Sequence, residues 1–151
     1  MSLELKPVNS KALLKEYIYL CRNLYQNEAR WVPPFYEDEW AFHDPEKNKI
    51  LQHCETMRML LYKDGKAVGR IMGIIHHPYN QMHQEKTARF FNFDCINDQE
   101  IAHTLINSSS TVANTVATPV TLSMAGITQL MDLAARMKNE DGDPMKAWPD
   151  K

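Results

Sequence analysis

The first part of the chain shows two hydrophobic spacings, one typical of a strand and one typical of a helix. Leucines alternate with charged residues over residues 3–8, which predicts a strand that Pro7 confines to the edge or end of a sheet. Asn9 and Ser10, both good N-cap residues, then precede apolar side chains that recur every three or four positions. We therefore predict an amphipathic helix that runs to about residue 26.

Two prolines separate this helix from a shorter one. Pro33 and Pro34 cannot continue a helix, because each lacks an N–H and biases the preceding residue toward an extended backbone. Pro34 can instead occupy the first turn of a second helix over residues 35–42, whose early acidic residues suit the positive end of its dipole. Asp44-Pro45 is expected to end this helix.

The middle of the chain predicts a β-hairpin and a further strand. Residues 56–62 and 67–76 are rich in β-forming residues, and Asp64-Gly65 between them is a strong signal for a two-residue turn. After a polar segment that we interpret as a loop, residues 89–96 carry phenylalanines and apolar positions on both faces. We predict a strand there that is covered on both faces and central in its sheet.

The last third predicts a helix, a strand and another helix. Asn97 or Asp98 is suited to cap a helix with an apolar stripe over residues 101–106, and the three serines at residues 108–110 are expected to end it. Beyond it we expect a strand over residues 116–122, which Pro119 weakens, and an amphipathic helix over residues 127–137. Residues 1–138 are interpreted as one domain and residues 139–151 as a loose polar tail.

Composition narrows the class of protein further. A chain of 151 residues that is 44% hydrophobic and 24% charged, with a net charge of -2, is typical of one globular domain and offers no basic field for nucleic acid or anionic lipid. Three widely spaced cysteines indicate reduced thiols and a cytoplasmic location. Residues 112–131 are uncharged, but their many polar side chains disfavour a membrane span.

Several short sequence segments together resemble a known superfamily. The predicted order of elements resembles the first part of the GNAT acyl-CoA N-acyltransferase fold. The amino-acid sequences of these segments are similar in particular to a longer bacterial GNAT-like family, over about residues 3–106. The segments that carry the likeness are Leu24-Tyr25, Trp31-Val32-Pro33-Pro34, Asp44-Pro45-Glu46-Lys47-Asn48, Lys63-Asp64-Gly65-Lys66-Ala67-Val68-Gly69-Arg70-Ile71, Asn80, Phe90-Phe91-Asn92-Phe93-Asp94 and Asn97-Asp98. After residue 106 the likeness is lost, and we expect a shortened or altered tail of a longer protein.

The resemblance implies a fold, a cofactor and a set of cofactor-binding residues. It implies an α/β (α+β) fold with a central mixed sheet, in which the fourth strand parts from the fifth and leaves a cleft for the pantetheine arm of acetyl-CoA or another acyl-CoA. The residues that would line this cleft are Phe93, Cys95, Ile96 and Asn97. The glycine-rich pattern that holds the CoA pyrophosphate in the superfamily is absent here, because residues 96–100 contain no glycine and two carboxylates.

Candidate catalytic residues are few. Acyl transfer to an amine needs a base and a proton donor for the leaving thiolate. Asp94 is the preferred base because it lies at a strand end, whereas the acidic run Glu37-Asp38-Glu39 suits a solvated helix face. Tyr79 and Cys95 are candidate acids, although a buried structural thiol is the commoner role of a cysteine.

Two further groups of residues bear on an acceptor pocket and on a metal site. Arg30, Trp31 and Tyr36 belong to an aromatic cluster around the diproline that suits either an acceptor pocket or core packing. His76, His77 and His83 do not predict a metal site, because adjacent residues in a strand point to opposite faces. Two functions remain open: a relative of acyl-CoA-dependent N-acyltransferases acting on a small-molecule acceptor, or a non-catalytic interaction module or homodimer subunit.

Overall fold

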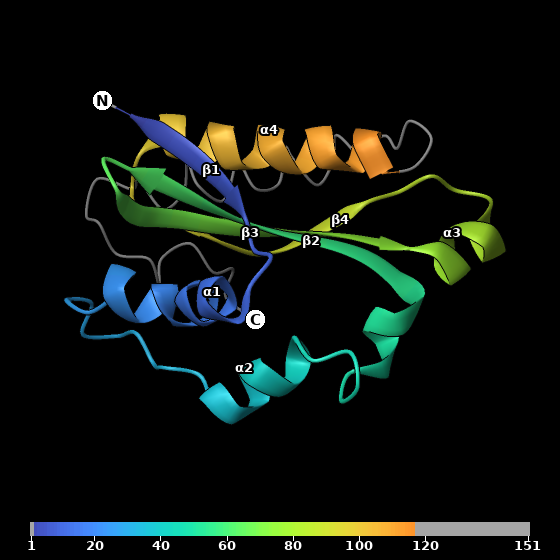
Figure 1. Ribbon diagram of the computed structural model, residues 1–151, viewed down its shortest axis with the longest axis horizontal. Helices are drawn as coiled ribbons and strands as arrows, with labels where there is room; N and C mark the ends of the chain where they lie inside the picture. The colour runs from blue at the N-terminus through green and yellow to red at the C-terminus, as the bar shows by residue number, and fades with distance from the viewer. Residues whose placement is uncertain (1, 117–151) are drawn as a thin grey trace, which may run out of the picture.

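A computed structural model describes residues 2–116 as an antiparallel sheet with helices on both faces (Figure 1). The strands lie in the order β1-β2-β3-β4, so each strand pairs with its neighbour in the chain. They are β1 (Leu3–Pro7), β2 (Cys54–Lys63), β3 (Lys66–His76) and β4 (Arg89–Cys95). The helices are α1 (Lys11–Leu24), α2 (Tyr36–Phe42), the short 3-10 helix η1 (Lys49–His53), α3 (His77–His83) and α4 (Gln99–Val116). The predicted α+β class is confirmed.

The first helix begins where the capping signal predicts. The Ser10 hydroxyl accepts a hydrogen bond from the Leu13 N–H at 3.2 Å, and α1 ends at Leu24. One face of α1 is buried against the sheet through Tyr17, Ile18, Leu20 and Cys21. The second helix is also found, but Phe35 is its N-cap, so Pro34 precedes α2 instead of lying in its first turn.

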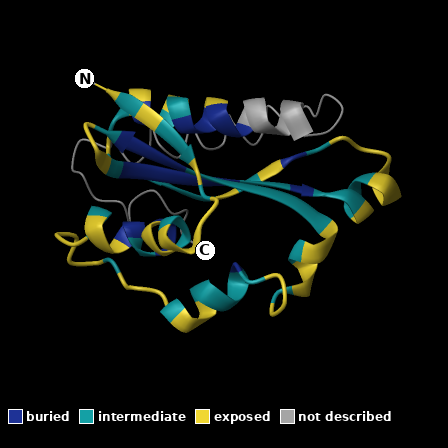
Figure 2. Cartoon of the chain, in the orientation of Figure 1, coloured by how far each residue is buried: buried dark blue, intermediate teal, exposed yellow. Residues whose placement is uncertain are grey.

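The predicted hairpin is confirmed together with its turn. Asp64 and Gly65 have φ angles of 50° and 80°, and the pair Lys63 and Lys66 closes the ladder of β2 and β3. Positive φ at both central residues is the requirement of a type I′ turn, whose twist matches the strands on either side. The hairpin forms the middle of the sheet, where most of the fully buried strand residues lie (Figure 2).

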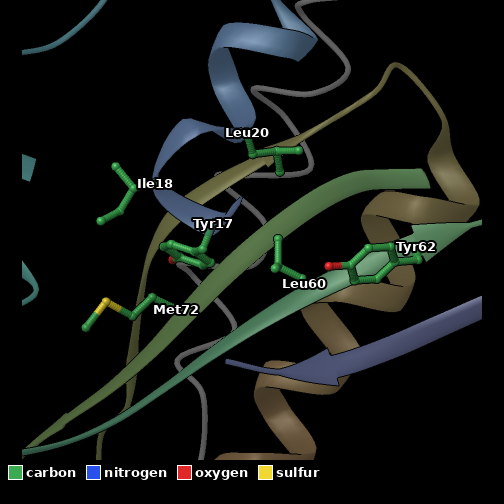
Figure 3. Close-up of a cluster of buried hydrophobic side chains, with 6 residues drawn as sticks. All are labelled: Tyr17, Ile18, Leu20, Leu60, Tyr62 and Met72. Atoms are coloured by element: carbon green, nitrogen blue, oxygen red, sulfur yellow. The ribbon is translucent and has the colours of Figure 1, made fainter. Parts of the chain in front are cut away.

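Side chains alternate between two cores, one on each face of the sheet. Tyr17, Ile18, Leu20, Leu60, Tyr62 and Met72 form the core between the sheet and α1 (Figure 3). Leu61, Val68, Ile71, Ile101 and Leu105 form the core between the sheet and α4. Successive strand residues such as Leu60 and Leu61 serve opposite cores because their side chains point to opposite faces.

Residues 77–83 form α3, so the predicted loop is wrong. Pro78 lies in the first turn, where its missing N–H costs nothing, and the His76 ring accepts a hydrogen bond from the Tyr79 N–H at 3.0 Å. Gln84 then ends the helix in the left-handed conformation with a φ of 52°. A proline and a histidine cap were therefore mistaken for loop residues.

Helix α4 is longer than predicted. It passes through the serines and ends at Val116, and the Ser108 hydroxyl satisfies itself by donating to the Leu105 carbonyl at 2.6 Å. Ser108 and Ser109 are buried where α4 crosses β3, and a small side chain suits this crossing. Val116 is therefore helical, and the rest of the strand predicted over residues 116–122, the helix over residues 127–137 and the tail over residues 139–151 lie outside the described residues.

Strand β4 is not central in the described sheet. It pairs with β3 alone among the described strands, and none of its residues is fully buried. Phe91 is 48% exposed and packs one side of its ring against Phe42, with the ring centres 5.1 Å apart. The phenylalanines predict a central strand covered on both faces, whereas within residues 2–116 β4 is an edge strand that is covered only in part.

The described sheet is antiparallel throughout, whereas the resemblance implied a mixed sheet. The mixed sheet thus lies outside what residues 2–116 can test. Within residues 2–116, no helix is both long and apolar enough to cross a membrane.

Candidate functional site

A β-bulge interrupts the edge strand β4. Arg70 of β3 pairs with Asp94 and Met72 pairs with Phe91, so Asn92 and Phe93 together lie opposite a single residue of β3. Asn92 takes the extra place with a φ of 51°, a conformation that asparagine tolerates better than most residues. Its side-chain oxygen is buried and has no hydrogen-bond partner. Bulges of this kind are frequent next to active sites, where they redirect a strand.

A buried ion pair lies next to the bulge. The Arg70 guanidinium donates from Nη2 and Nε to Oδ2 of Asp94 at 3.0 and 3.1 Å, and its Nη1 donates to the Tyr17 carbonyl at 2.8 Å. Its side chain is 7% exposed and that of Asp94 is 23% exposed. Burial lowers the pKa of Arg70, but its anionic neighbours, Asp94 among them, outweigh burial and leave that pKa raised. Arg70 therefore stays charged and ties α1 to both β3 and β4.

The second carboxylate oxygen of Asp94 is also engaged. The Tyr25 hydroxyl, at the end of α1, donates to Oδ1 at 2.9 Å. Burial, and then Asp94, raise the pKa of Tyr25, so its hydroxyl stays protonated. Burial likewise raises the pKa of the neighbouring Cys21 thiol to about 12. Both carboxylate oxygens of Asp94 thus accept hydrogen bonds, from three donors of two residues.

The residues predicted for an acceptor pocket do not come together. Trp31 lies beside Tyr25, with ring centres 6.0 Å apart, and so approaches the Asp94 cluster. Tyr36 instead stacks on Tyr19 at 4.4 Å, within the core under α1, and Arg30 is exposed. The aromatic residues around the diproline therefore split into two groups, and Trp31 is the one placed near Asp94.

The residues predicted to bind the cofactor lie at the end of β4. Phe93, Cys95 and Ile96 contribute to the core under α4, whereas Asn97 is exposed. Burial, followed by the charges of Asp94 and Asp98, raises the pKa of the Cys95 thiol to about 11. Cys95 and Asp94 point to opposite faces of the sheet, so they do not form an acid and base pair.

The other candidate acid and the histidines lie far from Asp94. Arg89, the first residue of β4, stacks on Tyr79, and Asp94 lies five positions further along the strand, about 17 Å at the usual rise. His76 caps α3, His77 approaches Glu55 at 3.4 Å, and His83 packs on Tyr79. In the described part of the chain, no group of three histidine, cysteine or acidic residues is arranged to hold a metal ion.

The start of α4 is capped by the chain itself. Oδ1 of Asp98 accepts hydrogen bonds from the N–H groups of Glu100 at 3.0 Å and Ile101 at 3.4 Å, while its Oδ2 lies 3.2 Å from Nζ of Lys63. The hydrogen bond from Lys63 and the one from the Ile101 N–H lower the pKa of Asp98. The carboxylate occupies the place where a helix N-terminus would otherwise receive an anion.

Sequence reasoning missed a second buried polar group on the same face of the sheet. His43 is 5% exposed, and its Nδ1 accepts a hydrogen bond from Nε of Arg58 at 2.8 Å. Burial, Arg58 and Arg70 lower the pKa of His43 to about 4, so its ring is neutral near pH 7.

The sequence does hold a signal for the role of Arg70. It is an arginine inside an apolar strand, and a buried arginine requires a charge partner.

Comparisons with solved structures show the fold. A tandem GNAT protein from the clavulanic acid biosynthesis pathway superposes on 75% of this chain and 33% of its own, with a TM-score of 0.53 and 16% identity. A GNAT-family acetyltransferase from Staphylococcus aureus superposes on 75% of this chain and 66% of its own, with a TM-score of 0.50 and 12% identity.

The curated proteins that this chain matches in sequence are much longer than the chain. The Escherichia coli protein YghO is 26% identical over 96 residues, which are 64% of this chain and 24% of that protein. A bacterial ceramide synthase from Caulobacter vibrioides is 31% identical over 65 residues, which are 43% of this chain and 17% of that protein. The chain thus matches a quarter or less of either relative, and no family model matches it. The structural neighbours nevertheless establish that this chain has a GNAT-like fold.

Proposed function

We propose that the chain is related to the acyl-CoA-dependent N-acyltransferases and binds an acyl thioester along β4. The observation that carries this proposal is the bulged edge strand beside the Arg70 and Asp94 pair, within a GNAT-like fold. An edge strand keeps backbone N–H and C=O groups unpaired on its outer side. Those groups suit the amides of a pantetheine arm, and we assign Phe93, Cys95, Ile96 and Asn97 to this contact.

The reaction would transfer an acyl group from sulfur to nitrogen. The acceptor nitrogen attacks the thioester carbonyl, a C–N bond forms, the C–S bond breaks, the amine loses a proton and the thiolate gains one. We propose that the acceptor amine binds at Asp94. The negative charge of this carboxylate attracts an ammonium group, and the carboxylate takes part in removing its proton. Arg70 and Tyr25 are positioning residues that hold this carboxylate in place.

The acceptor is proposed to be a small amine. One matched relative is called a ceramide synthase, and a ceramide contains an N-acyl amide, which agrees with an amine acceptor. Trp31, beside Tyr25, is the aromatic residue best placed to pack against the acceptor. Arg30 and Tyr36 are assigned to contacts with more remote parts of the acceptor.

A second function is favoured by the same edge. No described strand pairs with the outer side of β4, so another chain adding a strand there would give a homodimer or a complex without catalysis. In that case β4 serves as an interaction surface. The two functions differ in what covers β4.

Thermal unfolding with acetyl-CoA separates these two functions. A ligand that binds only the folded chain raises the melting temperature steadily with its concentration, and we expect this rise for the wild type, with a monomer by light scattering. The Asp94→Asn variant is expected to keep the rise, because the arm lies on the backbone of β4. No rise at millimolar ligand, together with a stable dimer, would establish the interaction module instead.

A further inference from the structure

We propose that the acyl donor is recognised through its pantetheine arm alone and that its nucleotide diphosphate is not bound at the start of α4. This inference rests on the proposed function. The donor class is acyl-pantetheine thioesters in general, and an acyl-CoA is one member of that class. The residues at the start of α4 do not fit a CoA pyrophosphate.

Most of the backbone donors of the first turn are already used. A helix leaves its first four N–H groups without partners inside the helix, and these form the usual anion site. Here Asp98 takes the N–H groups of Glu100 and Ile101 through its side chain, and its own N–H donates to the Ile96 carbonyl at 2.7 Å. A diphosphate would have to displace the chain's own carboxylate to reach them.

The charges at this turn also oppose a diphosphate. Asp98 is ionised at neutral pH, since its pKa is lowered, and Glu100 adds a second carboxylate in the first turn. The nearby cation, Lys63, is already paired with Asp98 at 3.2 Å. Every residue from 96 to 100 carries a side chain, so the backbone offers no glycine where a pyrophosphate could approach closely.

The edge of β4 is free of these obstacles. Its outer side is unpaired among the described strands, and the bulge at Asn92 lies two residues before Asp94. The backbone there is suited to the amides of the arm, which acyl-CoA and acyl-pantetheine share. Removing the nucleotide should therefore cost little affinity.

Calorimetric titration of the full chain tests this directly. Acetyl-CoA and acetyl-pantetheine are expected to bind with Kd values within about threefold of each other, and adenosine 3′,5′-bisphosphate is expected not to compete. An advantage of about tenfold or more for acetyl-CoA would overturn the inference and leave the proposed function standing. Binding of neither thioester would contradict both.

Two variants of Asp98 make the test specific to α4. Asp98→Gly removes the carboxylate and frees both N–H groups, whereas Asp98→Asn keeps a capping oxygen and removes only the charge. We expect Asp98→Gly to favour acetyl-CoA over acetyl-pantetheine by about fivefold more than the wild type does, and Asp98→Asn to stay closer to the wild type. Equal ratios in Asp98→Gly and the wild type, with both folded by circular dichroism, would refute the role given to this cap.

Discussion

Arg70 is the residue on which the candidate site depends most. Its guanidinium is almost fully buried and joins the Tyr17 carbonyl of α1 to the Asp94 carboxylate of β4. Removing one partner of a buried ion pair leaves a charge without compensation, whereas replacing both by apolar groups is often nearly neutral. Stability should therefore respond very differently to single and double substitutions here.

We predict that Arg70→Met lowers the free energy of unfolding by about 3 kcal/mol and that Asp94→Asn lowers it by less, because Asp94 keeps some contact with solvent. The double variant Arg70→Met/Asp94→Leu should lose clearly less than the sum of the corresponding single variants. Urea unfolding provides the measurement. Strictly additive losses would show that the pair is not coupled.

The lowered pKa of His43 makes the stability of the chain depend on pH. Its pKa is about 4 in the folded chain, against about 6.5 for an unfolded histidine, so between these values the unfolded chain binds the proton more readily. The stability that neutral His43 contributes is present above pH 6.5 and is lost as the pH falls toward 4, by about 3 kcal/mol in all. Unfolding of the wild type and of His43→Asn across this range should show a shallower slope for the variant, and parallel curves would contradict this assignment.

At the residue scale, sequence reasoning located one side of the ion pair. Asp94 and Trp31 were singled out from a strand end and from an aromatic segment, and the structure places both near Tyr25. Tyr25 and Asp94 are 69 positions apart, and Arg70 and Asp94 are 24 apart. No local pattern encodes such contacts, because they depend on how the helices pack on the sheet.

Elements with a local chemical signal were predicted well. The Ser10 cap, the Asp64-Gly65 turn and the Asp98 cap each appear where the sequence indicates them. The helix α3 and the end of α4 were missed, because Pro78 and the serines are tolerated inside helices when first-turn geometry or side-chain hydrogen bonds satisfy them. The edge position of β4 in the described sheet is not evident from the sequence, because burial depends on neighbours far away in the chain.

The contact between α4 and β3 requires a glycine at one particular place. A Cβ added to Gly69 would lie 2.6 Å from Cδ1 of Leu105 and 2.9 Å from Cβ of Cys95, whereas one added to Gly73 would lie 3.3 Å from Oγ of Ser109. We predict that Gly69→Ala destabilises the chain by about 2 kcal/mol and that Gly73→Ala, the matched control, costs less than half of that. Thermal unfolding of both variants tests this, and equal losses would contradict the packing described here.

At the scale of the molecule, helices cover both faces of the described sheet, and its β4 edge is where we propose that the donor binds. The helices α1 and α4 bury opposite faces of the sheet (Figure 1). Arg70 connects α1 to β4 next to the bulge, because it donates hydrogen bonds to the Tyr17 carbonyl and to Asp94. The first turn of α4, at the end of the same strand, is closed by Asp98. Our proposal therefore places a thioester donor along β4 and away from α4.

Amide hydrogen exchange with saturating acetyl-pantetheine tests this claim most directly. We predict slower exchange for amides of residues 89–97, which form and follow the edge strand, and unchanged exchange for residues 99–102 at the start of α4. Slower exchange at the start of α4 with none in β4, or no change in either segment, would contradict the account.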